Sequence, residues 1–465
     1  MEFVTKVVEC VNTFLWDYAL LILLLGAGII YSFSLKFIQI RKFGAGMKAL
    51  FGNFSLHGGK GENGLSSFQA LTTAIAAQVG TGNIAGAATA IASGGPGSIF
   101  WMWVSAFFGM ATIYAEAVMA QHTRKLENGH YVGGPVYYIK YVFKGRFGKF
   151  LAGFFSVAII LALGFMGNMV QSNSIGAAFN NAFHVPKLAV GICVAVIAGI
   201  IFIGGIKRIA NVSQVVVPFM ALLYVVFAVL LLLCNVTKIP NAIVQIVQGA
   251  FGYGDGIQGI RAAAGGVLGA MMAAMQNGVA KGIFSNEAGL GSAPIAAAAA
   301  KTKDTVRQGL VSMTGTFIDT IVICTMTGLA IVIAGSWANP DLKGVAITTV
   351  AFQSGLPFPS VVSSFVLMIC LAFFAFTTIL GWDYYSERCL EYLSNRNKTV
   401  VKVYRWIYVL AVFIGPYLTV AAVWTIADIF NGLMAIPNVI ALIALSGVVA
   451  KETRDYFKEF DRLSK

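Results

Sequence analysis

The residues best suited to chemistry form a short polar cluster inside an apolar stretch of the chain, residues 74–97. The cluster combines three polar side chains with two glycines: Gln78, Gly80, Thr81, Gly82 and Asn83. Glycine is a poor helix former, and hydrocarbon cannot satisfy the hydrogen bonds of the polar side chains. A helix that breaks within a membrane and turns bare backbone toward a cavity accounts for both features. We predict that this backbone binds a small zwitterion and a cation.

The two sides of such a break have opposite electrostatic character. A helix N-terminus leaves N–H groups unpaired and a C-terminus leaves carbonyl groups unpaired, with about half a charge at each end. The N–H groups of residues 81–83 suit a carboxylate, whereas the carbonyls of residues 76–79 suit an ammonium group or Na⁺. Close helix packing through Gly82 and Gly86 is the alternative, but it explains the glycines and not the polar side chains.

A second interruption of this kind lies in residues 276–291. We place its break between Asn277 and Phe284, so that Gln276 and Asn277 precede it and can hydrogen-bond a ligand. The helix would resume with Ser285 or Asn286 as a capping residue. Lys281 and Glu287 are predicted to form a buried ion pair that holds the break.

Three polar residues in apolar surroundings are candidates for a second cation site or for gating: Gln78, Glu287 and Asp319. A carboxylate inside a membrane is energetically costly, so it is a candidate functional residue. Structural hydrogen bonding is the alternative for Asp319. Glu116 lies near the end of its apolar segment, where it could act as a gate or as an anchor for a loop.

The composition of the 465 residues is that of an integral membrane protein. Hydrophobic residues make up 58% and charged residues only 11%, and the mean hydropathy is +0.80. A soluble domain has about 25% charged residues. The net charge of +13 is explained by positive loops on the cytoplasmic side rather than by nucleic-acid binding. The six cysteines show no spacing typical of disulfides or metal sites.

Because about 20 apolar residues cross a bilayer as a helix, the hydropathy pattern predicts about eleven spans in an all-α protein. They lie near residues 15–34, 66–93, 98–120, 150–180, 187–206, 212–235, 259–300, 308–335, 359–381, 404–426 and 430–449. With the N-terminus outside, 26 Lys and Arg fall on the cytoplasmic side and five outside. This bias follows the positive-inside rule and puts the C-terminus in the cytoplasm. Residues 36–50 and 453–465 read as basic amphipathic helices on the inner leaflet.

When the first span is set aside, the remaining ten divide into two sets of five. The interrupted segments begin each set and start on opposite sides of the membrane, which predicts an inverted repeat. Matching interruptions in two halves are the best sequence pointer to the binding site of a secondary transporter. The predicted regions are an N-terminal span with an inner-leaflet helix, a first repeat, an outer loop, a second repeat and a cytoplasmic tail, over residues 1–64, 65–235, 236–257, 258–450 and 451–465.

Several motifs resemble the alanine or glycine:cation symporter family of bacteria and archaea. They include residues 79–86 (VGTGNIAG), 94–103 (GGPGSIFWMW), 282–294 (GIFSNEAGLGSAP), 307–320 (RQGLVSMTGTFIDT) and 374–382 (FAFTTILGW). The resemblance covers most of the chain. It implies a LeuT-type inverted-repeat fold with two broken helices and one additional N-terminal span.

The run from Val79 to Asn83 also resembles the first-helix break of the neurotransmitter:sodium symporters, and this resemblance implies roles for individual residues. Thr81 and Gly82 would hold the amino-acid carboxylate. The carbonyls of Ala76 and Val79 would form a sodium site with the hydroxyls of Thr377 and Thr378. Gln78 and Asn83 stand where a second sodium would bind. The residues expected to close a pocket for alanine or glycine are Gln171, Gln276, Phe284 and Trp382.

The sequence therefore predicts a sodium-coupled symporter of small neutral amino acids, with Na⁺ as the co-transported ion, in a bacterial or archaeal plasma membrane. Proton coupling is the main alternative, and a channel or receptor without coupled transport is a further one. No catalytic motif supports an enzyme. The expected partners are an amino acid and membrane lipid, without nucleic acid, and the oligomeric state is left open.

Overall fold

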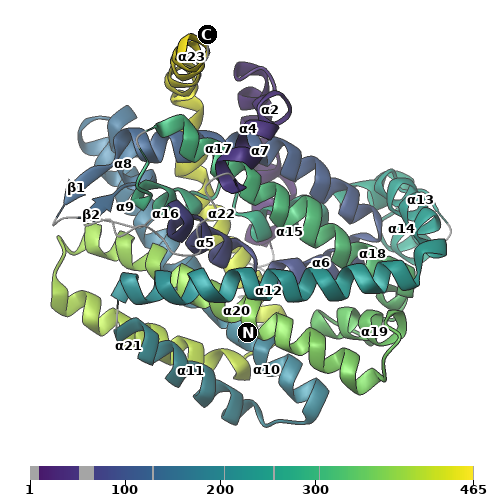
Figure 1. Ribbon diagram of the computed structural model, residues 1–465. Helices are drawn as coiled ribbons and strands as arrows, with labels where there is room; N and C mark the ends of the chain where they lie inside the picture. The colour runs from purple at the N-terminus through teal and green to yellow at the C-terminus, as the bar shows by residue number, and fades with distance from the viewer. Residues whose placement is uncertain are drawn as a thin grey trace.

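The computed structural model describes residues 10–51, 67–127, 130–203, 205–254, 257–302 and 304–463, and these are almost entirely helical (Figure 1). Strands β1 (Lys125–Glu127) and β2 (His130–Val132) pair as an antiparallel hairpin. The hairpin and α8 (Pro135–Val142) lie at one end of the long helices, and α13, α14 and α19 (Ile239–Ala250, Gln258–Ala263 and Val345–Gly355) lie at the other (Figure 1). We call the end with the hairpin the basic end. The predictions for residues 1–9 and 52–66 lie outside the described residues.

Eight helical stretches among the described residues are long and apolar enough to cross a membrane. Seven of them overlap one predicted span each: Cys10–Ser34, Gly97–Thr123, Gly145–Phe183, Arg208–Cys234, Thr305–Ala334, Ser360–Leu393 and Lys398–Tyr417. The eighth, Trp424–Ala444, covers most of the last predicted span and the end of the one before it. The other three predicted spans correspond to the 17-residue α11 (Lys187–Ile203) and to two interrupted helices. The count of eleven stays a prediction, as do the domain boundaries.

The structure divides these stretches and the segments between them into the following elements. The N-terminal ones are η1 (Phe14–Ala19), α2 (Leu20–Ser34), α3 (Ile38–Arg41) and α4 (Phe43–Phe51). The next are α7 (Gly97–Thr123), α9 (Gly145–Leu161), η3 (Ala162–Gly167), α10 (Asn168–Phe183), α12 (Gly205–Cys234) and η4 (Val236–Lys238). The last are α17 (Thr305–Thr316), η6 (Phe317–Cys324), α18 (Thr325–Ala334), η7 (Ser336–Ala338), α20 (Ser360–Leu393), α21 (Lys398–Ile414), η8 (Gly415–Tyr417), α22 (Val420–Ala444) and α23 (Ser446–Leu463).

The boundary between the last two predicted spans is wrong by several residues. The chain leaves α21 at Ile414 and begins α22 at Val420, where the sequence analysis predicted a loop at residues 427–429. Pro416 lacks a backbone N–H group and helps to end the earlier helix. The polar residues Asp428 and Asn431, at and beside the predicted loop, are both buried inside α22.

The first interrupted helix breaks where the sequence predicted. Helix α5 (Ser67–Gln78) ends before a bend at Val79 and Gly80, and the chain continues through the π-helix η2 (Gly82–Gly86) into α6 (Ala87–Gly94). Single-turn π-helical geometry is frequent at functional sites, because it leaves backbone groups outside the regular helical ladder.

The second break lies later than predicted. Helix α15 (Val267–Asn286) runs without interruption through Gly278 and Gly282, and only then does the chain unwind, before α16 (Ala293–Ala299). Both glycines serve packing against α7, since an added Cβ would lie 2.3 Å from the Ser98 carbonyl oxygen or 2.7 Å from Ser105 Oγ.

Left-handed backbone conformations mark the true position of the second break. Glu287, Gly289 and Gly291 have φ angles of 60°, 84° and 85°. Residues 287–292 therefore form an irregular segment between the two half-helices, because an α-helix cannot include such angles.

The two interrupted helices lie side by side in opposite directions. Helix α5 packs against α16, and α6 packs against α15, so the first half of each helix contacts the second half of the other (Figure 1). This crossing brings the two breaks together in the middle of the molecule. It is the arrangement that an inverted repeat requires.

Candidate functional site

The carbonyl oxygens at the end of α5 meet a hydroxyl group from α20. Thr378 Oγ1 lies 3.0 Å from the Ala76 carbonyl oxygen, 3.4 Å from that of Val79 and 3.0 Å from that of Phe374. The Gly80 backbone approaches closely, since an added Cβ would lie 2.4 Å from the same hydroxyl. The group is buried and rich in oxygen, and unwound carbonyls of this kind coordinate cations in secondary transporters.

Thr377 occupies a different position although it is adjacent in sequence. Its hydroxyl lies 2.9 Å from the Phe373 carbonyl oxygen and 3.0 Å from that of Phe374, and 3.3 Å from the sulfur of Met220. It therefore bonds within its own helix, as threonines in apolar helices often do. Of the predicted threonine pair, the structure brings only Thr378 to the carbonyls of the break.

Two backbone N–H groups at the start of the second half-helix point to amide oxygens. The Thr81 N–H donates to Gln171 Oε1 at 3.1 Å, and the Gly80 N–H donates to Asn83 Oδ1 at 2.9 Å. The Thr81 hydroxyl is buried and has no hydrogen-bond partner among the described residues. These donors are positioned to bind a carboxylate if the amide oxygens move aside.

A buried carboxylate lies between the two breaks. Asp319 in η6 accepts hydrogen bonds from Asn83 Nδ2 at 2.7 Å, from Ser285 Oγ at 2.9 Å and from Thr320 Oγ1 at 2.8 Å. Asn83 belongs to the first break and Ser285 to the end of α15, so Asp319 joins both. The sequence analysis singled out Asp319 but missed Thr320 and gave Ser285 only a capping role.

Gln78 forms a second connection between the breaks. Its side-chain amide donates to the Asn286 carbonyl oxygen at 3.0 Å. The Asn286 amide in turn donates to Thr320 Oγ1 at 3.0 Å, and its oxygen accepts from the Ala288 N–H at 3.0 Å. In this conformation Gln78 therefore holds the end of α15 against the end of α5.

A cluster of three aromatic rings reaches Gly82 through Phe284. The Phe284 ring lies 4.9 Å from that of Trp424 and 6.0 Å from that of Trp382, measured between centroids. A Cβ added to Gly82 would lie 3.3 Å from Phe284 and 3.0 Å from the Ser285 backbone. The structure thus places the predicted residues Gly82, Phe284 and Trp382 together. Trp424 was missed because it lies on the last long helix, far away in sequence.

The predicted ion pair between Lys281 and Glu287 is wrong. Lys281 Nζ lies 2.7 Å from Asp428 Oδ2 of α22, because residue 281 is inside α15 and on the side facing that helix. Glu287 accepts hydrogen bonds from Trp382 Nε1 at 2.5 Å and from Ser292 Oγ at 2.9 Å. It therefore ties the second break to α20 through hydrogen bonds from neutral side chains.

Glu116 of α7 anchors the second break from the other side. It accepts hydrogen bonds from the N–H groups of Gly289 and Gly291 at 3.2 and 3.1 Å, and from Asn438 Nδ2 at 2.6 Å. The fully buried carboxylate satisfies backbone donors that the irregular segment leaves outside any helix. Of the two roles predicted for Glu116, the structure shows that of an anchor.

Gln276 and Asn277 do not join this cluster. They lie on α15 about ten residues before its end, which corresponds to roughly 15 Å along the helix axis. Asn277 Nδ2 donates to the Ala273 carbonyl oxygen of its own helix at 2.8 Å. Their prediction as residues that precede a break required a break at Gly278 to Gly282, which the structure does not contain. The pocket role that the family resemblance implies for Gln276 stays a prediction.

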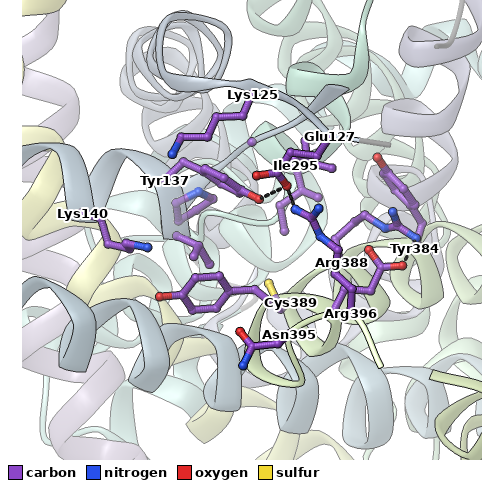
Figure 2. A pocket seen from close by; sticks show the side chains of 16 residues that line it. Lys125, Glu127, Tyr137, Lys140, Ile295, Tyr384, Arg388, Cys389, Asn395 and Arg396 are labelled. Atoms are coloured by element: carbon purple, nitrogen blue, oxygen red, sulfur yellow. Dashed lines mark hydrogen bonds and ion pairs between the residues drawn. The ribbon is translucent and has the colours of Figure 1, made fainter. Parts of the chain in front are cut away.

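A cavity of about 340 Å³ opens at the basic end, between the hairpin, α8, α16 and the end of α20 (Figure 2). Glu127 and Arg396 form an ion pair across it, and Tyr137 donates a hydrogen bond to Glu127 at 3.3 Å. Burial raises the pKa of Tyr137 to about 12, so its hydroxyl remains a donor. Ile295 lines the cavity from α16, the half-helix that follows the second break.

Comparisons with known proteins agree with this architecture. The family model described as the sodium:alanine symporter family matches residues 1–464. The sodium/alanine symporter AgcS of Methanococcus maripaludis is 45% identical over 98% of each chain. The probable sodium/glutamine symporter GlnT of Bacillus subtilis is 40% identical over 98% of this chain and 92% of its own. The solved structure of MhsT in complex with L-phenylalanine has a TM-score of 0.56 and 13% identity, over 85% of this chain and 99% of that one.

Two antiparallel broken helices whose unwound segments meet in a buried polar cluster define a secondary transporter of the LeuT fold. More particularly, the chain belongs to the sodium:alanine symporter family. It is a cation-coupled amino-acid symporter of the plasma membrane and not an enzyme.

Proposed function

We propose that this protein couples the entry of Na⁺ to the uptake of a small neutral amino acid, alanine or glycine, by alternating access. The observation that carries the proposal is the position of Thr378, whose hydroxyl lies within 3.4 Å of the Ala76 and Val79 carbonyl oxygens. Na⁺ at this point would join α5 to α20 and would favour the conformation in which they are packed together. A ligand shifts a conformational equilibrium only by such a difference in affinity.

The amino-acid carboxylate would bind at the N–H groups of Thr81 and Gly82, with the Thr81 hydroxyl as a further donor. In the conformation described here, Gln171 Oε1 accepts the hydrogen bond of the Thr81 N–H group. We infer that this amide oxygen rotates away, or turns to the ammonium group, when the substrate enters. The substrate side chain would be small, because Phe284 lies directly against Gly82 and is itself packed by Trp382 and Trp424.

Asp319 is the proposed second cation site. Its carboxylate accepts hydrogen bonds from side chains of both breaks, Asn83 and Ser285, and all three side chains are buried. A cation there would replace the hydrogen-bond donors that now face the carboxylate. Glu287 is less suited to this role, because its hydrogen bonds reach only Ser292 of the second break and Trp382 of α20, so a cation there would not join the two breaks.

We further propose that the basic end faces the cytoplasm, with the N-terminus outside and the C-terminus inside. The cavity in Figure 2 combines residues of two predicted inner loops, including Lys140 from one and Arg396 from the other. It would become the inner vestibule when α16 moves. The ion pair between Glu127 and Arg396 would then separate.

The test uses purified protein in liposomes with radiolabelled alanine. Uptake should rise with an imposed inward Na⁺ gradient and should saturate with alanine. Uptake that follows an imposed proton gradient and ignores sodium would replace sodium coupling with proton coupling. Downhill flux that never drives accumulation would favour a channel over a symporter.

A further inference from the structure

A second cavity lies between the turn after α2 and the C-terminal helix α23. Its volume is about 340 Å³, and five cations line it: Lys36, Arg41, Lys42, Arg454 and Lys458. None of the described residues that line it is acidic. We propose that this cavity binds the phosphate headgroup of an anionic membrane lipid.

The cations are held in place by two elements distant in sequence. On α23, Ala450, Arg454 and Lys458 are spaced four residues apart and therefore share one helix face. On the opposite wall, the chain reverses after α2 with left-handed φ angles of 54° and 53° at Lys36 and Phe37. Lys42 Nζ lies 4.0 Å from the centre of the Phe457 ring, so the two walls are in contact.

The charges in this cavity are not neutralised within the described part of the chain. None of the five cations forms an ion pair with a described residue. Glu452 of α23 instead lies 3.3 Å from His122 and accepts a hydrogen bond from Thr305 at 3.1 Å. Five like charges around one concave surface create a positive potential that attracts an anion.

The surroundings favour a lipid over a soluble anion. Leu35 and Ile38 line the cavity beside the cations. Next to it, Phe33 and Ile40 are 65% and 62% exposed, and α2 belongs to a stretch apolar enough to cross a membrane. A lipid whose phosphate headgroup occupies the cavity would therefore have its acyl chains on an apolar helix face. Basic pockets beside transmembrane helices on the cytoplasmic side bind anionic headgroups in this way.

The experiment measures lipid binding to the full-length protein in a zwitterionic detergent by native mass spectrometry, with phosphatidylglycerol or phosphatidylcholine added. The test variant carries Arg41→Gln, Arg454→Gln and Lys458→Gln. The matched control carries Lys144→Gln, Arg146→Gln and Lys149→Gln, which removes three exposed cations near α8 that do not line this cavity. Thermal unfolding in detergent shows whether each variant is folded.

The native protein and the control should bind one phosphatidylglycerol more tightly than phosphatidylcholine. The test variant should lose about 100-fold in affinity for phosphatidylglycerol, since each cation near an anionic lipid contributes roughly fivefold. If the test and control variants lost affinity equally, the binding would depend on general surface charge and the proposal would be wrong. Equal binding by all three proteins would also overturn it. Competition by soluble glycerophosphoglycerol at the affinity of the lipid would assign the cavity to a soluble phosphate instead.

Discussion

Thr378 and Ala76 are 302 residues apart in sequence, yet the threonine hydroxyl lies 3.0 Å from the alanine carbonyl oxygen. This contact joins the end of α5 to the middle of α20. It also separates Thr378 from its neighbour Thr377, whose hydroxyl faces Met220.

The first prediction concerns these two threonines. Thr378→Ala should raise the sodium concentration for half-maximal alanine uptake about tenfold, because one oxygen ligand is worth about 1.4 kcal/mol. Thr377→Ala should change it little, and Thr378→Ser should restore native behaviour. Sodium titrations of uptake in liposomes measure this. Equal effects of the two alanine variants would show that the Thr378 hydroxyl is not a sodium ligand.

The second prediction concerns the carboxylate between the breaks. Asp319→Asn should raise the half-saturating sodium concentration by about tenfold or more, because a negative charge next to a bound cation is lost in a poorly solvated site. It should also reduce the number of sodium ions taken up with each alanine. The control is Asp341→Asn, at an exposed position in the loop before α19. Parallel ²²Na⁺ and alanine uptake measures the ratio, and an unchanged ratio would exclude Asp319 as an ion site.

The third prediction tests the glycine that faces the aromatic rings. Gly82→Val should abolish alanine binding, because even a single added carbon would lie 3.0 Å from the Ser285 backbone. Gly153→Val is the matched control on α9, where an added Cβ meets no atom within 4 Å. Binding is measured by scintillation proximity with labelled alanine. If the Gly82 variant bound alanine normally, the substrate would have to lie elsewhere.

The fourth prediction concerns the stability of the second break. Glu116→Gln replaces one acceptor oxygen by an amide that faces N–H donors, so it should lower the free energy of unfolding by about 2 kcal/mol. Glu459→Gln, at an exposed position on α23, should change it by less than about 0.5 kcal/mol. Thermal unfolding in detergent compares the two. A shift no larger than that of the control would show that the anchor contributes nothing.

The fifth prediction concerns the buried pair of Lys281 and Asp428. Either Lys281→Met or Asp428→Leu alone should destabilise the protein by about 3 kcal/mol or more, because the remaining charge is buried without a partner. The double variant should recover most of this loss. A double-mutant cycle on unfolding measures the coupling. Strictly additive losses would contradict a direct interaction.

The sequence was sufficient to predict the class of protein and much of the first break. The clustering of Gln78, Thr81 and Asn83 with two glycines has no other reasonable place in a bilayer, since polar groups need partners there. The hydropathy pattern located the long spans because a helix that crosses the bilayer must consist mainly of apolar residues. These features are local, so the order of residues alone determines them.

Only the tertiary structure decided which residues meet. Gly278 and Gly282 looked like a helix break, but contact with α7 makes them packing residues, and the chain unwinds instead at Glu287. Lys281 contacts Asp428 rather than Glu287, because the direction of a helical side chain depends on the true helix boundary and on the helix packed against it. A helix-breaking residue specifies where a chain can unwind, whereas the neighbouring helices determine where it does.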